Sequence, residues 1–254
     1  LEEEFDTVLF LRSKNGVTLT ESGHILAKLF SGFSACYAAT RSKILELQQS
    51  PHAQPLRLGV TPTNAYCVYR TYFDGFQQHH PDIPLHVEEH SAFDAWKLLQ
   101  DGDLDAFFTP ARPDSTFFKT LELYQNPIMI GAAENSALAS KPSVSIADIL
   151  DLPLGFFNAP MPIEAILNAC FHALGKQPNV VLRTSDQLLL RELTVQGRLY
   201  PILPLDMMVT WEGVCEISLD FFHPSCNRMV WCDALSHGPE MAAFLSYMER
   251  QVTQ

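Results

Sequence analysis

The sequence is short of positive charge and of long apolar runs, and both shortages limit what the chain can be. It has 17 lysines and arginines against 29 aspartates and glutamates, for a formal net charge of -12. Such a chain lacks the general electrostatic attraction that dominates nucleic-acid binding, although a small basic segment can still contact DNA. No apolar stretch reaches the roughly 18 residues that a membrane-spanning helix needs. We therefore expect no contact with a membrane.

Motifs of common enzymes and metal sites are missing as well. The sequence has no HExxH, GxSxG or P-loop, so no catalytic reaction is favoured. The six cysteines form no CxxC pair, and their spacing matches no common zinc pattern. A redox or zinc role for Cys215, Cys226 and Cys232 is the alternative to structural thiols, which we favour. We expect no enzyme activity, no cofactor and no metal.

The residues between 56 and 108 alternate between short β-favouring runs and helical patterns. Leu56–Val60, Leu85–Glu89 and Leu104–Phe108 are typical of strands. Such alternation predicts parallel strands joined by right-handed crossovers. A helix is expected after each of the first two strands, the second of them over Ala95–Leu99. The apolar face of the first helix is expected to contain Tyr66, Tyr69, Tyr72, Phe73 and Phe76.

Small polar residues follow each of these strands. Thr61, Thr63 and Asn64 come after the first strand, Ser91 after the second and Thr109 after the third. In parallel α/β sheets, ligands bind beyond the carboxyl ends of the strands, where helix N-termini suit an anion. Each of these residues can also simply cap its own helix. Their recurrence at every strand end favours a binding cleft, and none is a strong nucleophile.

Apolar residues at the start of the chain are spaced as one face of a helix, at Leu1, Phe5, Val8 and Leu9. Helical periodicity of this kind predicts that the chain begins inside a helix. The opening Leu-Glu-Glu-Glu resembles neither a signal peptide nor a transit peptide. We therefore expect a reducing, cytoplasmic environment, in which cysteines stay thiols.

A basic hairpin is predicted next. Leu9–Ser13 and Val17–Thr20 favour β structure, and Asn15-Gly16 between them is a strong signal for a two-residue turn. A helix followed by a tight hairpin with Arg12 and Lys14 is typical of the end of a winged helix-turn-helix. An edge hairpin without a special role is the alternative.

One long helical pattern runs from Thr20 to about Gln49, and Ser50–Pro55 follows as a linker because its two prolines cannot continue a helix. Too little of the chain lies nearby to bury the apolar stripe of this helix. A second copy of the chain is therefore expected to cover it, and packing on the same chain is the alternative. The stripe contains Leu26, Leu29, Phe33, Cys36, Ile44 and Leu47.

Short motifs along the whole chain follow one another in an order that is known from one protein family. The first group is Leu1-Glu2, Phe5, Leu9-Phe10, Arg12, Val17, Leu19-Thr20 and Gly23. The later group is Leu58-Gly59-Val60-Thr61, Gly102-Asp103-Leu104-Asp105 and Gly197…Leu203-Pro204. The first group resembles the end of the DNA-binding domain of LysR-type transcriptional regulators, and the later group resembles the rest of that family.

The chain also departs from the family pattern. The first helices of the family's DNA-binding domain would lie before Leu1, so only a remnant of that domain is expected. Gly197-Arg198-Leu199-Tyr200 replaces the small-residue glycine turn that is common in the family. Peroxide-sensing members have a reactive cysteine pair near the turn equivalent to Asn158–Pro162, where this chain has no cysteine.

The resemblance implies an α/β fold in which a two-lobed, periplasmic-binding-protein-like effector domain follows a long linker helix and the remnant of a winged helix-turn-helix. The second lobe is expected to present its own polar residues, Asn158, Thr184 and Ser185, at strand ends. A final helix, Pro239–Gln251, is expected to return to the first lobe. The expected bounds are 1–19 for the remnant, 20–50 for the linker helix, 56–127 with 225–254 for the first lobe, and 128–224 for the second.

The resemblance further implies a bacterial transcription factor that binds promoter DNA and senses a small-molecule effector, with an anion suggested by the polar strand ends. Arg12, Lys14 and Asn15 would contact DNA, and Arg112 would either pair with an anionic effector or stay solvated. The linker helix would form a homodimer, which can pair into a homotetramer. A solute-binding protein of a transport system, with the same two-lobed fold, is the alternative function.

Overall fold

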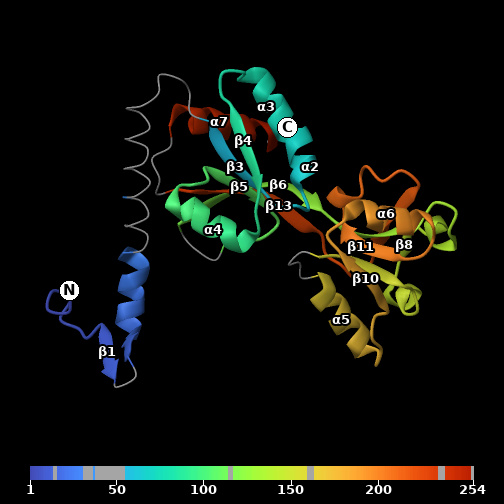
Figure 1. Ribbon diagram of the computed structural model, residues 1–254, viewed down its shortest axis with the longest axis horizontal. Coiled ribbons are helices and arrows are strands. Elements are labelled where there is room, and N and C mark those ends of the chain that lie inside the picture. The colour runs from blue at the N-terminus through green and yellow to red at the C-terminus, as the bar shows by residue number, and fades with distance from the viewer. Residues whose placement is uncertain are drawn as a thin grey trace.

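The computed structural model has two α/β lobes, with a hairpin and a helical segment at its N-terminal side (Figure 1). It describes residues 1–13, 16–30, 37, 55–113, 117–158, 163–233 and 238–252, and for Arg12 and Ser13 the backbone alone. A five-stranded sheet forms the centre of the first lobe, and a six-stranded sheet forms the centre of the second. The α/β, two-lobed fold class that the sequence predicts is confirmed.

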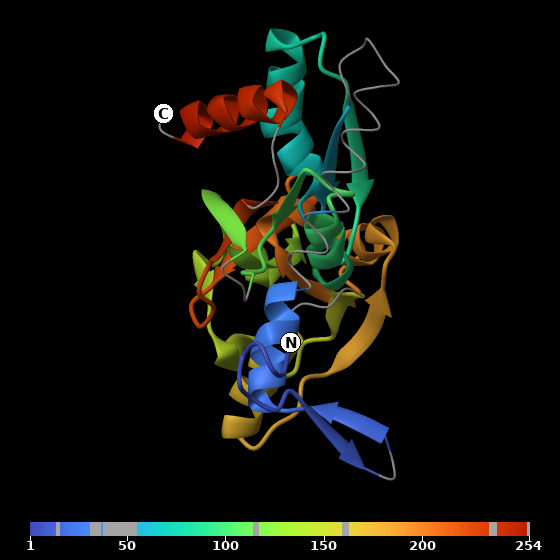
Figure 2. The same cartoon turned by 90° about the vertical axis from the view of Figure 1, so that its left-hand side faces the viewer.

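The predicted hairpin is confirmed. Strands β1 (Phe10–Ser13) and β2 (Gly16–Leu19) pair antiparallel, with Phe10 opposite Leu19. Figure 2 shows the hairpin beside the helical segment that follows it. Lys14 and Asn15, two of the three residues expected to contact DNA, lie outside the described residues.

The helix predicted at the very start of the chain is wrong, because residues 1–7 form turns. The carboxylate of Glu2 accepts hydrogen bonds from the backbone N–H groups of Leu9 (2.6 Å) and Phe10 (3.0 Å). Asp6 has a positive φ of 44°. The Glu2 carboxylate therefore folds the chain back on itself. Apolar residues four positions apart fit such turns as well as they fit a helix.

The segment after the hairpin is helical over residues 21–30. The hydroxyl of Thr20 accepts a hydrogen bond from the N–H of Gly23 at 3.0 Å, so Thr20 caps this helix as expected. Ile25, Leu29 and Phe30 are largely exposed on it. Apart from residue 37, which is helical, the rest of the expected linker helix lies outside the described residues.

The five-stranded sheet of the first lobe has the order β4-β3-β5-β13-β6. Strand β3 pairs parallel with both β4 and β5, as the alternation of strands and helices predicts, while β13 pairs antiparallel with β5 and β6. The strands are β3 (Leu56–Val60), β4 (Leu85–Glu89), β5 (Ala106–Thr109), β6 (Phe118–Asn126) and β13 (Ser225–Cys232).

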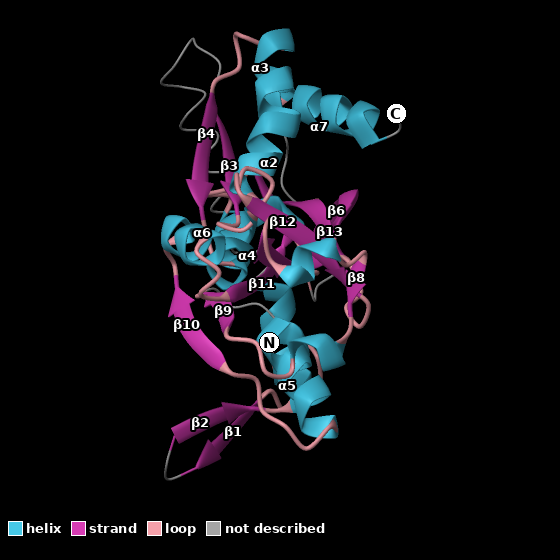
Figure 3. Ribbon diagram, turned by 90° about the vertical axis from the view of Figure 1, so that its right-hand side faces the viewer, coloured by secondary structure: helices cyan, strands magenta, loops and turns pink. Residues whose placement is uncertain are grey.

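Helices cover both faces of this sheet. One face packs on a continuous helical run and on the C-terminal helix, through Phe73, Phe76, Phe108 and Phe244. The other face packs on α4 through Phe107 and its neighbours. Figure 3 shows α7 crossing α3 at one end of the molecule. The elements are α2 (Ala65–Val68), a π-helical turn (Tyr69–Phe73), α3 (Asp74–His79), α4 (Ala92–Asp101) and α7 (Pro239–Val252).

The aromatic face predicted for the first helix is only partly correct. Tyr72, Phe73 and Phe76 are buried, whereas Tyr66 and Tyr69 are 49% and 42% exposed. A π-helical turn adds one residue to a helical turn and so shifts the residues before it around the axis. The regular spacing of the five aromatic residues therefore does not put them on one face.

The six-stranded sheet of the second lobe has the order β10-β9-β11-β7-β12-β8. Helices α5 (Ile163–Ala173) and α6 (Gln187–Val195) pack on it, and short 3-10 turns occupy Ala137–Ser140, Ile146–Ile149 and Leu205–Met207. The strands are β7 (Ile128–Ala133), β8 (Ser143–Val144), β9 (Leu154–Phe157), β10 (Val180–Thr184), β11 (Tyr200–Pro204) and β12 (Val214–Leu219).

Two segments cross between the lobes. The first runs from β6 to β7 through Pro127, and the second runs from β12 to β13. Ser225 at the start of β13 pairs with Asn126 at the end of β6, so the two crossings lie side by side. No helix in the described part of the chain is long and apolar enough to cross a membrane.

Candidate functional site

The polar residues at the strand ends of the first lobe are buried together rather than spread over the surface. Thr61, Thr63, Asn64 and Thr109 are 9%, 7%, 1% and 0% exposed. Asn64 comes directly before α2, but its side chain makes no capping hydrogen bond to that helix. Helix capping alone therefore does not explain this residue.

Hydrogen bonds hold this group in one arrangement. The carbonyl oxygen of the Asn64 side chain accepts from the N–H of Thr61 at 3.1 Å. The amide nitrogen of Asn64 donates to the backbone carbonyl of Phe108, on the neighbouring strand, at 3.2 Å. The hydroxyls of Thr61 and Thr63 lie 3.1 Å apart. One hydroxyl of that pair donates to the other, so one proton is left over for a further acceptor.

Ser91 acts as a cap, as the sequence predicts. Its hydroxyl accepts from the N–H of Asp94 at 3.2 Å and donates to the Asp94 carboxylate at 2.7 Å. The capping interpretation therefore accounts for its hydrogen bonds. In the described part of the chain, Ser91 makes no side-chain hydrogen bond to the buried group.

The polar residues of the second lobe are more open. Asn158 and Ser185 are exposed, and Thr184 is partly buried. The Ser185 hydroxyl lies 3.5 Å from the backbone carbonyl of Asn158, so the structure brings these two residues together. The Thr184 hydroxyl accepts from the N–H of Asp186 at 3.0 Å, which stabilises the turn before α6. The first contact joins the ends of β9 and β10, and the second is local to the end of β10.

A hydrogen-bond network that sequence reasoning missed connects the first lobe to the second. The Asn64 amide donates to the side-chain carbonyl of Asn227 on β13 at 3.2 Å. Asn227 in turn donates to the carboxylate of Asp206 at 2.9 Å, and the Tyr124 hydroxyl donates to the same oxygen at 2.5 Å. Asp206 follows β11 of the second lobe, and its N–H donates to the side chain of Asn126 at 3.3 Å.

Burial sets the protonation of this network. It raises the pKa of Asp206, an effect that hydrogen bonds from Tyr124 and Asn227 partly offset. It also raises the pKa of Tyr124, so the phenol stays protonated and donates to Asp206. Cys67, whose thiol donates to the backbone carbonyl of Asp206 at 3.8 Å, has its pKa raised to about 12 by burial. A thiol with that pKa is a poor nucleophile.

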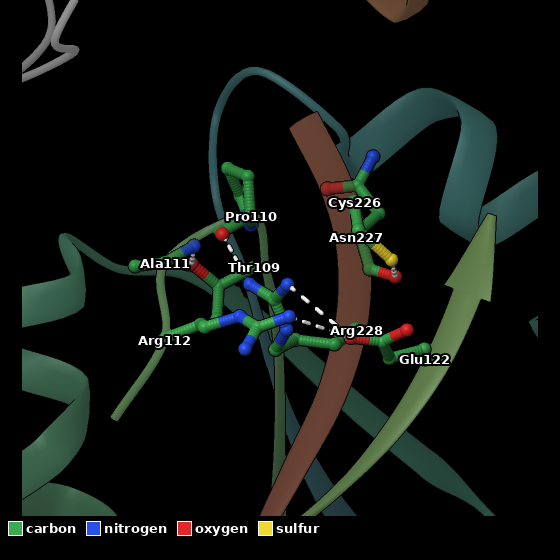
Figure 4. A network of polar contacts seen from close by, with 8 residues as sticks. All are labelled: Thr109, Pro110, Ala111, Arg112, Glu122, Cys226, Asn227 and Arg228. Atoms are coloured by element: carbon green, nitrogen blue, oxygen red, sulfur yellow. Dashed lines mark hydrogen bonds and ion pairs between the residues drawn. The ribbon is translucent and has the colours of Figure 1, made fainter. Parts of the chain in front are cut away.

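A second buried polar residue lies one position further along β13. Arg228 is 3% exposed and lies beside Thr109 and Glu122 (Figure 4). Arg112, which the sequence offers as an anion-binding residue, is exposed and donates to Glu122 at 3.0 Å. Asn227 and Arg228 lie in the first half of β13, directly before the apolar end of that strand, and this position was the available sequence signal.

Cys67, Cys170, Cys215 and Cys226 are free thiols. Cys215 lies on β12, while Cys226 and Cys232 lie at opposite ends of β13. Among the residues that the structure describes, no group of three histidines, cysteines or acidic residues is placed to hold a metal ion.

Two α/β lobes, joined by two crossing segments and bearing polar residues at the strand ends, define the class of the protein. It has the periplasmic-binding-protein type of fold. The family described as the LysR substrate binding domain matches residues 49–253, and the chain belongs to this family. It therefore contains the effector-binding domain of a LysR-type transcriptional regulator, and this family consists of regulators, not enzymes.

Several known proteins are similar to the chain. The DNA-binding transcriptional dual regulator OxyR of Escherichia coli (strain K12) is 22% identical over 209 residues, which are 80% of this chain and 67% of OxyR. The regulatory domain of CcmR from Synechocystis PCC6803, in complex with 2-PG, has a TM-score of 0.68 at 17% identity and covers 79% of this chain and 98% of its own. Full-length CbnR, complexed with its target DNA, has a TM-score of 0.64 at 17% identity, with 99% and 86% covered.

Proposed function

We propose that the chain senses a small anionic effector between its two lobes and passes the signal to promoter DNA. Thr61, Thr63, Asn64, Ser91 and Thr109 would bind the effector from the first lobe. From the second lobe the binding residues would be Asn158, Thr184 and Ser185. The similar CcmR domain is in complex with 2-PG, which supports a small-molecule effector for a domain of this fold.

The observation on which this proposal mainly rests is the continuous hydrogen-bond path between the lobes. It begins at Thr61, passes through the side chains of Asn64 and Asn227, and ends at the carboxylate of Asp206. Buried polar groups cost free energy unless they are paired, so such a path favours a single arrangement of its members. An effector that binds Thr61 and Thr63 would change the partners of Asn64 and thereby the contact with the second lobe.

The mechanism follows from that coupling. A ligand changes the population of two lobe arrangements only if it binds one of them more tightly. Donors at the end of β3 and at the ends of β9 and β10 can contact one ligand together only when the lobes are suitably oriented. The effector would therefore favour that orientation and change how the DNA-binding parts of the oligomer are spaced.

The remaining assignments concern DNA, assembly and location. We propose that residues 1–19 are the end of a winged helix-turn-helix whose Arg12, Lys14 and Asn15 contact promoter DNA, in line with the similar CbnR, which is complexed with its target DNA. Residues 20–50 would form the linker helix of a homodimer that can pair into a tetramer, and the exposed Ile25, Leu29 and Phe30 support an apolar partner there. The lobe bounds would be 56–127 with 225–254, and 128–224. A regulator of promoters works in the cytoplasm.

A thermal-shift screen with organic acids, amino acids, sugars and nucleotides tests the effector proposal. A ligand at one hundred times its dissociation constant stabilises the folded state by about 2.7 kcal/mol. For a chain of this size that corresponds to a rise in Tm of roughly 5–11 °C. We expect one class of anion to give such a shift with the unmodified chain and not with Thr63→Ala.

The control variant is Thr71→Ala, which removes an exposed threonine from the helical run that follows the site. It should keep the full shift. A ligand whose shift is equal in all three proteins binds elsewhere and contradicts the proposed site. Ligand-bound and ligand-free protein that gave identical footprints on promoter DNA would contradict the proposed mechanism.

A further inference from the structure

A buried arginine lies next to one of the proposed effector residues. Arg228 on β13 is the register partner of Thr109 on β5 and of Glu122 on β6, so the three residues form one row across the sheet. Phe107 and Val230, two positions from Thr109 and Arg228, pack against α4, so the row lies on that face of the sheet. Figure 4 shows Arg228, Arg112 and Glu122 converging beside Thr109.

The positive charge of Arg228 is poorly compensated for a buried group. Its side chain is 4% exposed, and its nearest carboxylate oxygen, on Glu122, is 3.9 Å from the guanidinium nitrogen. That distance is too long for a hydrogen bond. Within the described residues its hydrogen bond goes to the backbone carbonyl of Pro110. A guanidinium has five N–H donors, and a buried charge is costly without a close, hydrogen-bonded partner.

The carboxylate of Glu122 is shared and easily displaced. The same Glu122 oxygen that faces Arg228 accepts from Arg112 at 3.0 Å. The side chains of Arg112 and Glu122 are 76% and 57% exposed. Exposed ion pairs of this kind contribute little to stability, because water competes for both charges. The Glu122 carboxylate can therefore leave at small cost and open Arg228 to an anion from solution.

Thr109 adds a donor of its own to this place. Its side chain is fully buried, and its hydroxyl oxygen accepts from the N–H of Ala111 at 3.1 Å. Within the described residues no acceptor receives the hydroxyl proton. Two guanidinium groups thus face the one carboxylate of Glu122, and the buried Thr109 lies beside Arg228 on the neighbouring strand. The cluster has an excess of one positive charge.

We propose that Arg228, Arg112 and Thr109 form a binding site for the carboxylate group of a small organic acid, and that the Glu122 carboxylate occupies this site while no ligand is bound. The inference rests on the proposed function through Thr109, and it names carboxylates as the effector class. The planar guanidinium fork matches a carboxylate with two parallel hydrogen bonds. The position of the Glu122 oxygen already marks where such a group fits.

Acetate, a small carboxylate, tests the site in the whole chain. Acetate is titrated at constant ionic strength against chloride, while Tm and the Nε–H NMR signal of Arg228 are followed. Glu122→Gln removes the competing carboxylate but keeps the shape of the side chain. We expect acetate to bind Glu122→Gln about tenfold more tightly than the unmodified chain, because at least one charge-assisted hydrogen bond becomes available to the ligand.

The matched control is Glu164→Gln, which breaks the exposed ion pair of Glu164 with Arg183 at 2.7 Å in the second lobe and has no buried arginine beside it. It should bind acetate no better than the unmodified chain. Arg228→Lys keeps the positive charge but loses the planar guanidinium group. In the Glu122→Gln background, it should bind acetate at least tenfold more weakly than Glu122→Gln alone. The NMR signal that is missing from Arg228→Lys assigns the Arg228 resonance.

The site would be overturned if Glu122→Gln and Glu164→Gln bound acetate equally well. It would also be overturned if acetate did not shift the Arg228 Nε–H signal in the unmodified chain or in Glu122→Gln. Should Arg228→Lys fail to fold, the comparison of acetate affinities between Glu122→Gln and Glu164→Gln decides alone. Thr63→Ala separates the two proposals. If the acetate response survives in Thr63→Ala while no screened compound depends on Thr63, then the effector proposal fails and the carboxylate site stands.

Discussion

The two lobes present the same kind of polar residues at their strand ends, but they use them differently. In the first lobe, Thr61, Thr63 and Asn64 are buried and joined by hydrogen bonds, and Thr109 is buried beside Arg228. In the second lobe, Asn158 and Ser185 are exposed, and the hydrogen bond between them runs from the Ser185 hydroxyl to a backbone carbonyl. The first set is fixed before a ligand arrives, whereas the second set is accessible and only locally held.

This difference shows that a strand-end serine or threonine becomes part of a built site only when neighbouring strands supply partners. Strand β13 passes beside β5 and brings Asn227 to Asn64 and Arg228 to Thr109. No corresponding polar residue from a distant segment contacts Asn158 or Ser185 in the described part of the chain. We therefore expect the first lobe to determine which effector binds, and the second lobe to change its position when that effector is bound.

The largest expected effect comes from breaking the network of the first lobe at its centre. Asn227→Leu removes both hydrogen bonds of a fully buried side chain and leaves the Asn64 amide and the Asp206 carboxylate without it. Each unsatisfied buried group costs about 1–3 kcal/mol, so we expect a loss of about 3 kcal/mol in the free energy of unfolding. Urea denaturation measures it. Asn158→Leu in the second lobe should change stability by less than about 0.5 kcal/mol; equal losses would remove the contrast between the lobes.

The next effect is a change of pH dependence through Asp206. Because burial raises its pKa, the folded state holds this proton more tightly than the unfolded state. The contribution of Asp206 to stability is thus fully present below the ordinary aspartate pKa of about 3.9 and is lost as pH rises through the raised value, by at most about 1.4 kcal/mol per pH unit. Asp206→Asn cannot titrate, so the stability of the unmodified chain relative to this variant should fall from pH 4 upwards.

Denaturation curves of both proteins at pH 4, 5, 6 and 7 measure this difference. If the stability of the unmodified chain relative to Asp206→Asn rose with pH instead, the pKa of Asp206 would be lowered, and the network would stabilise the carboxylate as an anion. Tyr124→Phe, which removes one donor to the ionised form, should raise the pKa of Asp206 further and steepen the loss.

A moderate effect is expected at the cap of α4. Ser91→Ala removes the hydroxyl that accepts from the N–H of Asp94, and loss of such a cap costs about 1 kcal/mol. Ser91→Asp, which keeps an acceptor at the cap, should restore most of it. If Ser91→Ala leaves the stability unchanged but weakens effector binding, Ser91 belongs with the ligand residues rather than with the caps.

The smallest effect is expected at the open end of the second lobe. Thr184→Val removes one local hydrogen bond, to the N–H of Asp186, from a partly buried side chain, so stability should fall by about 0.5 kcal/mol or less. Thr61→Val, the matched change in the first lobe, should cost about 1–2 kcal/mol, because Thr61 is buried against Thr63. Thermal unfolding of both variants measures the two losses of stability. Equal losses would remove the contrast between the lobes.

The sequence predicted the elements of the fold well, and for physical reasons that are local. The pairing of β1 with β2, the Ser91 cap and the αL glycine after α4, Gly102 with φ of 74°, are decided by a few neighbouring residues. It failed where a regular pattern had two physical solutions. The spacing of Leu1, Phe5, Val8 and Leu9 fits turns as well as a helix, and the Glu2 carboxylate selects the turns.

The candidate site shows the same boundary. The positions of Thr61, Thr63, Asn64 and Thr109 after their strands could be predicted, because alternation of strands and helices fixes which ends of a parallel sheet meet. Their partners Asn227, Asp206 and Tyr124 could not. Asn227 is 163 residues from Asn64 along the chain, and Asp206 is 139 residues from Cys67. Tyr124 and Asp206 are 82 residues apart.

The sequence by itself thus determined the alternating elements, the caps, the family and the polar strand ends, because each depends on residues close together along the chain. Only the tertiary structure decided that Asp206 joins the lobes and that Arg228 is buried beside Thr109. Both results depend on β13 returning from the second lobe to lie between β5 and β6. The periodicity of the sequence does not predict that return, because the return brings together residues that are far apart along the chain.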